Sequence, residues 1–132
     1  DDRLTAGLIC DGAHVDPLIV RLTWHAMGPD RLVLVSDAVA GADGPSPDAA
    51  AVVGSDGVLR GSTAMLDAGV RNLVAFTGAS VVDALTTATR NPGRLIGRGD
   101  LGVLGPGEPV ARAGDPMADR LATQPARRAR PA

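Results

Sequence analysis

Residues 5–37 read TAGLICDGAHVDPLIVRLTWHAMGPDRLVLVSD, and this stretch decides the fold class. Residues 5–10 form a short apolar run that ends at Asp11. Such a run indicates a buried strand followed by a loop. Residues 31–36 form a second apolar run, which ends at Asp37. The sequence therefore predicts two buried strands, each ending in an aspartate.

The segment between the two runs carries the signals of a helix. Asp16 followed by Pro17 is typical of a helix start, and Gly28 followed by Pro29 is typical of a helix end. Four apolar residues recur at helical spacing between them, namely Leu18, Ile19, Leu22 and Ala26. Strand, helix and strand at this spacing predict a βαβ unit whose two strands are parallel.

A loop, a hairpin and a helix are expected next. Residues 41–48, GADGPSPD, are rich in turn formers and predict a loop. Residues 51–53 and 58–59 flank a turn-forming segment and predict a small β-hairpin. Ser62 or Thr63 can then cap a helix. The apolar face of that helix is expected to carry Met65, Leu66, Val70, Leu73 and Val74, and Gly78 to close it.

A further helix is indicated by Ser80 with Asp83 three residues later, a pairing that resembles a capping box. Residues 92–96 are expected to add one more helical turn. Beyond residue 108 the apolar periodicity fades, and residues 109–132 predict an irregular Arg/Ala/Pro-rich tail.

Composition limits the classes of partner. The formal net charge is −2, and every basic residue is an arginine. The arginines cluster only in the tail, which argues against a nucleic-acid surface. The single Cys10 cannot form an internal disulfide, no secretory leader pattern is present, and no apolar run approaches roughly 18 residues. We expect a cytoplasmic protein without a membrane segment.

The polar residues that follow the two strands are the candidates for chemistry. Ligands of parallel α/β folds bind at the carboxyl ends of strands. Asp37 can serve there as a general base or metal ligand, or simply as a turn or helix-cap residue. His14 can bind an anion or a polar substrate, or be a satisfied loop histidine. The spacing of His14 and His25 does not predict a metal site, and His25 is expected to be structural or solvent-facing.

Six segments together resemble one known family, the N-acetylglucosamine-6-phosphate deacetylases of the amidohydrolase superfamily. The segments are DGAHVDP at 11–17, LVSDAVA at 34–40, GVLRGST at 57–63, AGVRNLV at 68–74, ATRNPGRLIG at 88–97 and LGVLGPGE at 101–108. The first two are the most specific. The resemblance covers residues 4–108.

The resemblance implies an α/β fold that is the C-terminal portion of an amidohydrolase-type TIM (β/α)8 barrel. Residues 1–108 would be an incomplete barrel containing its last two strands and the helices that follow, and residues 109–132 a separate irregular tail. The family removes acetate from N-acetylglucosamine 6-phosphate and gives glucosamine 6-phosphate. The complete enzyme is implied to be a homodimer.

The resemblance also implies roles for individual residues. Asp37 would be catalytic, activating a metal-bound water and passing its proton to the leaving amine. The family's divalent metal, of the zinc or iron class, would have its ligands upstream of residue 1 and none within this chain. Substrate-binding residues would be Asp11, Gly12, Ala13 and His14, with His14 near the phosphate, and Leu59, Arg60 and Gly61 on the opposite wall.

Two alternatives remain open at this point. The chain could be a noncatalytic remnant or interaction module that keeps the pocket motifs, or an amidohydrolase acting on another amide substrate. We expect the chain alone to be inactive, because the implied metal ligands lie outside it.

Overall fold

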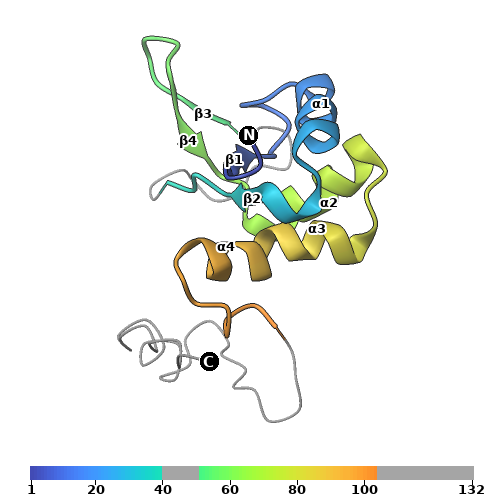
Figure 1. The fold of residues 1–132 in the computed structure, drawn as a ribbon. Coiled ribbons are helices and arrows are strands. Elements are labelled where there is room, and N and C mark those ends of the chain that lie inside the picture. The colour runs from blue at the N-terminus through green and yellow to red at the C-terminus, as the bar shows by residue number, and fades with distance from the viewer. Residues whose placement is uncertain (40–50, 104–132) are drawn as a thin grey trace, which may run out of the picture.

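A computed structural model describes residues 1–39 and 51–103 of the chain (Figure 1). The described residues form a small α/β structure, as the sequence predicts. The predicted loop at 41–48, the proposed boundary at residue 108 and the tail at 109–132 lie outside the described residues.

The βαβ unit is confirmed. Strand β1 (Ala6–Ile9) is followed by helix α1 (Pro17–Met27), the short 3-10 helix η1 (Pro29–Arg31) and strand β2 (Leu32–Val35). The two strands pair in parallel, with Ala6 opposite Leu32 and Ile9 opposite Val35. Their carboxyl ends therefore lie side by side, followed at once by the loops that carry Asp11 and Asp37.

Local signals fix both ends of α1. The Asp16 side chain accepts a hydrogen bond from the Leu18 N–H at 2.8 Å, and Pro17 occupies the first helical position. At the other end the Gly28 N–H donates to the Trp24 carbonyl at 2.8 Å, with Gly28 at a φ of 70°. Both caps agree with the sequence prediction.

The helices cover one face of the two-stranded sheet. Leu8 and Cys10 from the first strand segment and Leu32 and Leu34 from β2 are buried in one cluster with side chains of the helices. On the opposite face Val33 is buried, whereas Val35 at the end of β2 is 43% exposed. The sheet therefore leaves apolar surface open at its carboxyl end.

The face of α1 that packs is not the one marked by the apolar spacing. Leu18, Ile19 and Leu22 are all exposed, while Val20 is fully buried and Trp24 packs against the core. Val20 and Trp24 are one helical turn apart and so share a face. The helix is apolar on more than one side, and the path of the chain back to β2 decides which side meets the sheet.

The predicted hairpin is present and extends further than expected. Strand β3 (Ala51–Val53) pairs antiparallel with β4 (Leu59–Ser62). Ser62 therefore ends a strand and does not cap helix α2 (Leu66–Thr77), whose N-cap is Met65 without a side-chain cap bond. The prediction of a Ser62 or Thr63 cap is wrong, because α2 begins only at Leu66. The Ser62 hydroxyl accepts from the Ala64 N–H at 3.0 Å and donates to Asp11, 51 positions away. Gly78 closes α2 in the left-handed conformation, as predicted.

Two later helices complete the described fold. The capping box of α3 (Val81–Ala88) is confirmed, since the Ser80 Oγ accepts from the Asp83 N–H at 3.1 Å. Helix α4 (Arg90–Leu95) contains the expected extra turn. In α4 the buried Asn91 side chain donates to the carbonyls of Pro29 and Leu32 at 2.6 and 2.7 Å, which fastens α4 to the start of β2. Among the residues described, no helix is long and apolar enough to cross a membrane.

Cys10 is predicted to be chemically inert in the folded chain. Its side chain is buried in the core, and burial together with the neighbouring Asp11 charge raises the pKa of the thiol to about 11. The thiolate is the reactive form, so we expect negligible modification by a thiol reagent at neutral pH and full modification in denaturant. Rapid labelling of the native chain would contradict this packing.

Candidate functional site

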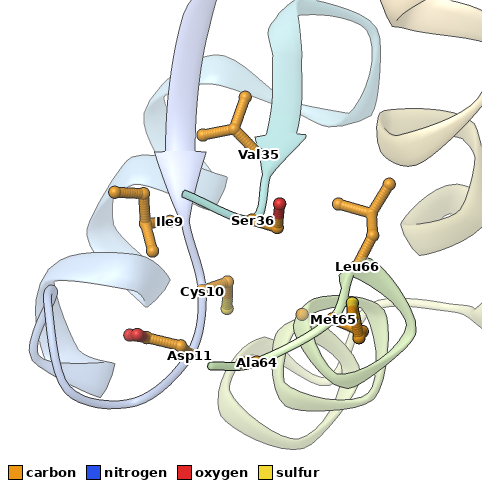
Figure 2. A pocket seen from close by; sticks show the side chains of 9 residues that line it. Ile9, Cys10, Asp11, Val35, Ser36, Ala64, Met65 and Leu66 are labelled. Atoms are coloured by element: carbon orange, nitrogen blue, oxygen red, sulfur yellow. The ribbon is translucent and has the colours of Figure 1, made fainter. Parts of the chain in front are cut away.

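The candidate site lies at the carboxyl ends of β1 and β2. Figure 2 shows the two strands ending side by side, with Asp11 in the loop after β1 and the start of α2 approaching from the facing segment. Ser36 follows β2, and a small depression among these segments is lined by residues of both strand ends and by Ala64 and Met65. This is the end of a parallel sheet at which ligands bind.

The centre of the site is the buried carboxylate of Asp11. Its Oδ1 accepts hydrogen bonds from the backbone N–H groups of Ala13 and His14, both at 2.9 Å. Its Oδ2 meets the His14 Nδ1 at 2.7 Å and accepts from the Ser62 hydroxyl at 2.8 Å. The side chain is only 2% exposed. Asp11 is thus occupied by hydrogen bonds from protein groups.

These hydrogen bonds keep the carboxylate ionised. Burial alone would raise the pKa of Asp11, but the N–H groups of His14 and Ala13, followed by the Ser62 hydroxyl and the His14 ring, outweigh it and lower the pKa to about 2. An ionised carboxylate can only accept hydrogen bonds. The Nδ1 atom of His14 therefore carries the hydrogen in this pair.

His14 and Asp37 face one another across the two strand ends. The His14 Nε2 lies 3.8 Å from the Asp37 Oδ2, which is too long for a direct hydrogen bond. The His14 side chain is 12% exposed and that of Asp37 is 50% exposed. Both groups therefore remain available to a ligand, and together they offer a carboxylate for proton transfer beside an imidazole nitrogen.

The segment that carries Asp37 is held by β4. The Ser62 N–H donates to the Asp37 carbonyl at 2.8 Å, and the Val39 N–H donates to the Ser62 carbonyl at 3.1 Å. Asp37 itself has a φ of 50°, a left-handed conformation that aspartate tolerates better than most residues. The close approach needs glycine at position 61, because a Cβ there would lie 2.9 Å from the Asp37 carbonyl oxygen and collide with the Val39 side chain.

The structure brings together some of the expected site residues and separates others. Gly12, Ala13 and His14 form the loop around Asp11, and Gly12 has a φ of 83° that favours glycine. Gly61 contacts the Asp37 segment. Leu59 and Arg60 lie further out on the exposed hairpin, where Arg60 pairs with Asp56 at 2.5 Å.

Sequence reasoning favoured a helix cap for Ser62 and did not include it among the predicted site residues. Its hydroxyl bond to Asp11 joins two segments that the local sequence gives no reason to connect. Its place next to Gly61 in the GVLRGST segment is the signal that could have identified Ser62 as a site residue.

The described residues do not by themselves make a metal centre. Within residues 1–39 and 51–103, no group of three or more His, Cys, Asp or Glu side chains is placed to hold an ion. Asp37 and His14 are two polar groups at one rim, which is less than the donor set that a divalent cation needs.

Comparisons with known proteins give one consistent result. No family model matches the chain. The chain is 35% identical to a candidate N-acetylgalactosamine-6-phosphate deacetylase of Escherichia coli K12, over 82% of this chain and 71% of that protein. It is 36% identical to the N-acetylglucosamine-6-phosphate deacetylase of Bos taurus, over 73% of this chain and 28% of that protein.

A solved structure matches as well. A variant of N-acetyl-D-glucosamine-6-phosphate deacetylase from Mycobacterium smegmatis, in complex with N-acetyl-D-glucosamine-6-phosphate, is 35% identical, with a TM-score of 0.60. The match covers 74% of this chain and 30% of that one. The chain thus spans most of the first relative but only about three-tenths of the length of the other two.

The buried, hydrogen-bonded carboxylate of Asp11 predicts how the stability of the fold changes at acid pH. Because its pKa is about 2 in the folded chain, against an ordinary 3.8, Asp11 stabilises the fold above pH 4 and loses this contribution as the pH falls towards 2. The shift corresponds to up to roughly 2 kcal/mol. In Asp11→Asn, urea unfolding between pH 5 and pH 2 should lack that increment.

The matched control is Asp2→Asn, since the Asp2 side chain is 99% exposed. Its acid dependence should equal that of the wild-type chain. If the stability of Asp11→Asn falls with pH as steeply as that of the wild type, the Asp11 carboxylate does not supply this pH-dependent stability.

Proposed function

Since the chain belongs to the family of N-acetylglucosamine- and N-acetylgalactosamine-6-phosphate deacetylases, we propose that it forms the proton-transfer side of a hydrolase that releases acetate from an N-acetylhexosamine 6-phosphate. The observation that carries the proposal is the placing of Asp37 beside His14, with their Oδ2 and Nε2 atoms 3.8 Å apart at the carboxyl ends of two parallel strands. The family's substrates are sugar phosphates with an amide to be cleaved.

The fold of the whole protein is proposed to be an amidohydrolase-type (β/α)8 barrel, of which β1 and β2 are the last two strands. Two features support this. The strands are parallel with helices packed on the face that carries Leu8 and Leu34, and on the opposite face Val35 is 43% exposed. In a barrel that second face is the interior, which the other strands enclose. The boundary at residue 108, the irregular tail at 109–132 and a homodimer belong to the same proposal.

Asp37 is proposed as the catalytic residue. Deacetylation needs a proton to leave the attacking water and another to reach the amine nitrogen as the C–N bond breaks. A carboxylate on a rigid strand end, half exposed and pinned through its own backbone carbonyl, can accept the first proton and deliver it to the nitrogen. Asp37 then carries out both proton transfers from the same position.

His14 and the loop 11–14 are proposed to bind the sugar phosphate. Leu59, Arg60 and Gly61 are proposed for the facing wall, with Gly61 the member that contacts the Asp37 segment. A divalent cation of the zinc or iron class would polarise the amide carbonyl. Because the described residues do not fit such an ion alone, its ligands are assigned to the part of the relatives' length that this chain does not span.

A chimeric enzyme tests the proposal. The segment of the Mycobacterium smegmatis deacetylase that matches this chain would be replaced by residues 1–103, and acetate release would be measured from N-acetylglucosamine and N-acetylgalactosamine 6-phosphates with added Zn²⁺. Both sugars are needed because relatives of both names are similarly identical to the chain. We expect metal-dependent turnover, which Asp37→Asn lowers about 100-fold or more, as loss of a general base does.

Asp30→Asn is the matched control, because Asp30 is exposed and lies before β2, at the other end of the sheet from Asp37. It should leave turnover within about twofold, as surface changes usually do. The unfused chain should release no acetate above the blank. A folded chimera that is inactive on both sugars, or one whose activity survives Asp37→Asn, would refute the proposal and favour a noncatalytic module.

A further inference from the structure

Ser62 hydrogen-bonds both halves of the candidate site. Its hydroxyl donates to the Asp11 Oδ2 at 2.8 Å, and its backbone N–H donates to the Asp37 carbonyl at 2.8 Å. The residue is fully buried at the end of β4. It therefore links the loop after β1 to the loop after β2. In the sequence Ser62 lies 51 positions after Asp11 and 25 positions after Asp37.

We propose that Ser62 is a positioning residue, which holds the Asp11 carboxylate so that Asp11 in turn fixes the tautomer and direction of the His14 ring. The same oxygen, Asp11 Oδ2, takes the Ser62 hydroxyl and faces the His14 Nδ1. Ser62 therefore acts through Asp11 and does not touch the ligand. The assignment of a binding role to His14 rests on the function proposed above, whereas the control of the ring by Ser62 rests on this geometry alone.

The geometry dictates which ring nitrogen is left for chemistry. With Nδ1–H donated to Asp11, a neutral His14 has its lone pair on Nε2, which faces Asp37 at 3.8 Å. Moving the hydrogen from Nδ1 to Nε2 would turn a donor towards Asp37 instead, and flipping the ring would put ring carbons where its two nitrogens now stand. A histidine ring is commonly held in one orientation and one tautomer by donating an N–H to a carboxylate. That carboxylate is in turn held by a further hydrogen bond.

Alanine at position 62 would remove one of the two side-chain donors on Asp11 Oδ2. The remaining partners of Asp11 come from its own loop, namely the N–H groups of Ala13 and His14 and the His14 ring. A loop bonded only to itself can turn as a unit relative to β4. The hydroxyl of Ser62 is the side-chain contact on Asp11 that ties that loop to the strand holding Asp37.

The test is the ¹⁵N spectrum of the histidine rings in the full chain, recorded at about pH 8.5, roughly two units above the ordinary histidine pKa. The chain has two histidines, and the exposed His25 on α1 is an internal reference. In the wild-type chain we expect His14 to show a protonated Nδ1 and an unprotonated Nε2, while His25 shows the averaged tautomers of free histidine. In Ser62→Ala, the His14 signals should move towards those of His25.

Ser80→Ala is the matched control, since the Ser80 hydroxyl likewise donates to a carboxylate, that of Asp83 at 2.8 Å, and accepts from a backbone N–H, but at α3, away from the site. It should lower stability without moving the His14 signals. Ser62→Cys, similar in size and a weak donor, provides a second variant if alanine does not fold, and it should shift His14 in the same direction as alanine.

Two results would overturn the inference. One is a folded Ser62→Ala or Ser62→Cys chain whose His14 signals stay at the wild-type positions. The other is a wild-type spectrum in which the hydrogen of His14 is on Nε2, and this result requires no variant. Neither result depends on substrate turnover. An inactive chimera would refute the proposed function but not this inference, and an active chimera would not by itself support this inference.

Discussion

A buried negative charge organises this end of the molecule. The Asp11 carboxylate accepts hydrogen bonds from its own loop, from the His14 ring and from the end of β4, and these contacts hold it ionised against the cost of burial. A charge in such a place must be satisfied, so the loop after β1 can adopt few other conformations. The direction of His14, and through Ser62 the distance to Asp37, follow from that requirement.

The second constraint is the incomplete covering of the sheet and of α1. Leu8 and Leu34 lie under the helices, whereas Val35 and the exposed face of α1, with Leu18 and Leu22, remain accessible. Exposed apolar side chains that lie together are typical of a surface that another part of a protein covers. They fit the proposal that the rest of a barrel covers them, since the chain spans about three-tenths of the solved relative.

The sequence predicted those features that local chemistry decides. The parallel βαβ unit, the Asp16 cap, the Ser80 capping box and the glycine at the end of α2 were all readable from neighbouring residues. Of the site, the places of Asp37 and His14 at the strand ends followed from the same unit.

What the sequence did not predict depends on contacts between distant segments. The apolar spacing of α1 gave the helix but not its buried side, because that side is chosen by the sheet beneath Val20. Ser62 looked like a helix cap, but its backbone pairs with Ala51 in the hairpin and its hydroxyl donates to a carboxylate 51 residues away. Such partners have no local signature.

The most direct test of the central claim, that the ligand site lies at the carboxyl ends of β1 and β2, is a titration of the ¹⁵N-labelled chain with glucosamine 6-phosphate. The account predicts that the backbone amide signals of residues 11–14 and 37–39 shift in a saturable manner, while those of 90–95, which include the Asn91 that fastens α4 to the start of β2, stay in place. Shifts confined to residues 90–95, or shifts spread evenly over the chain, would contradict it.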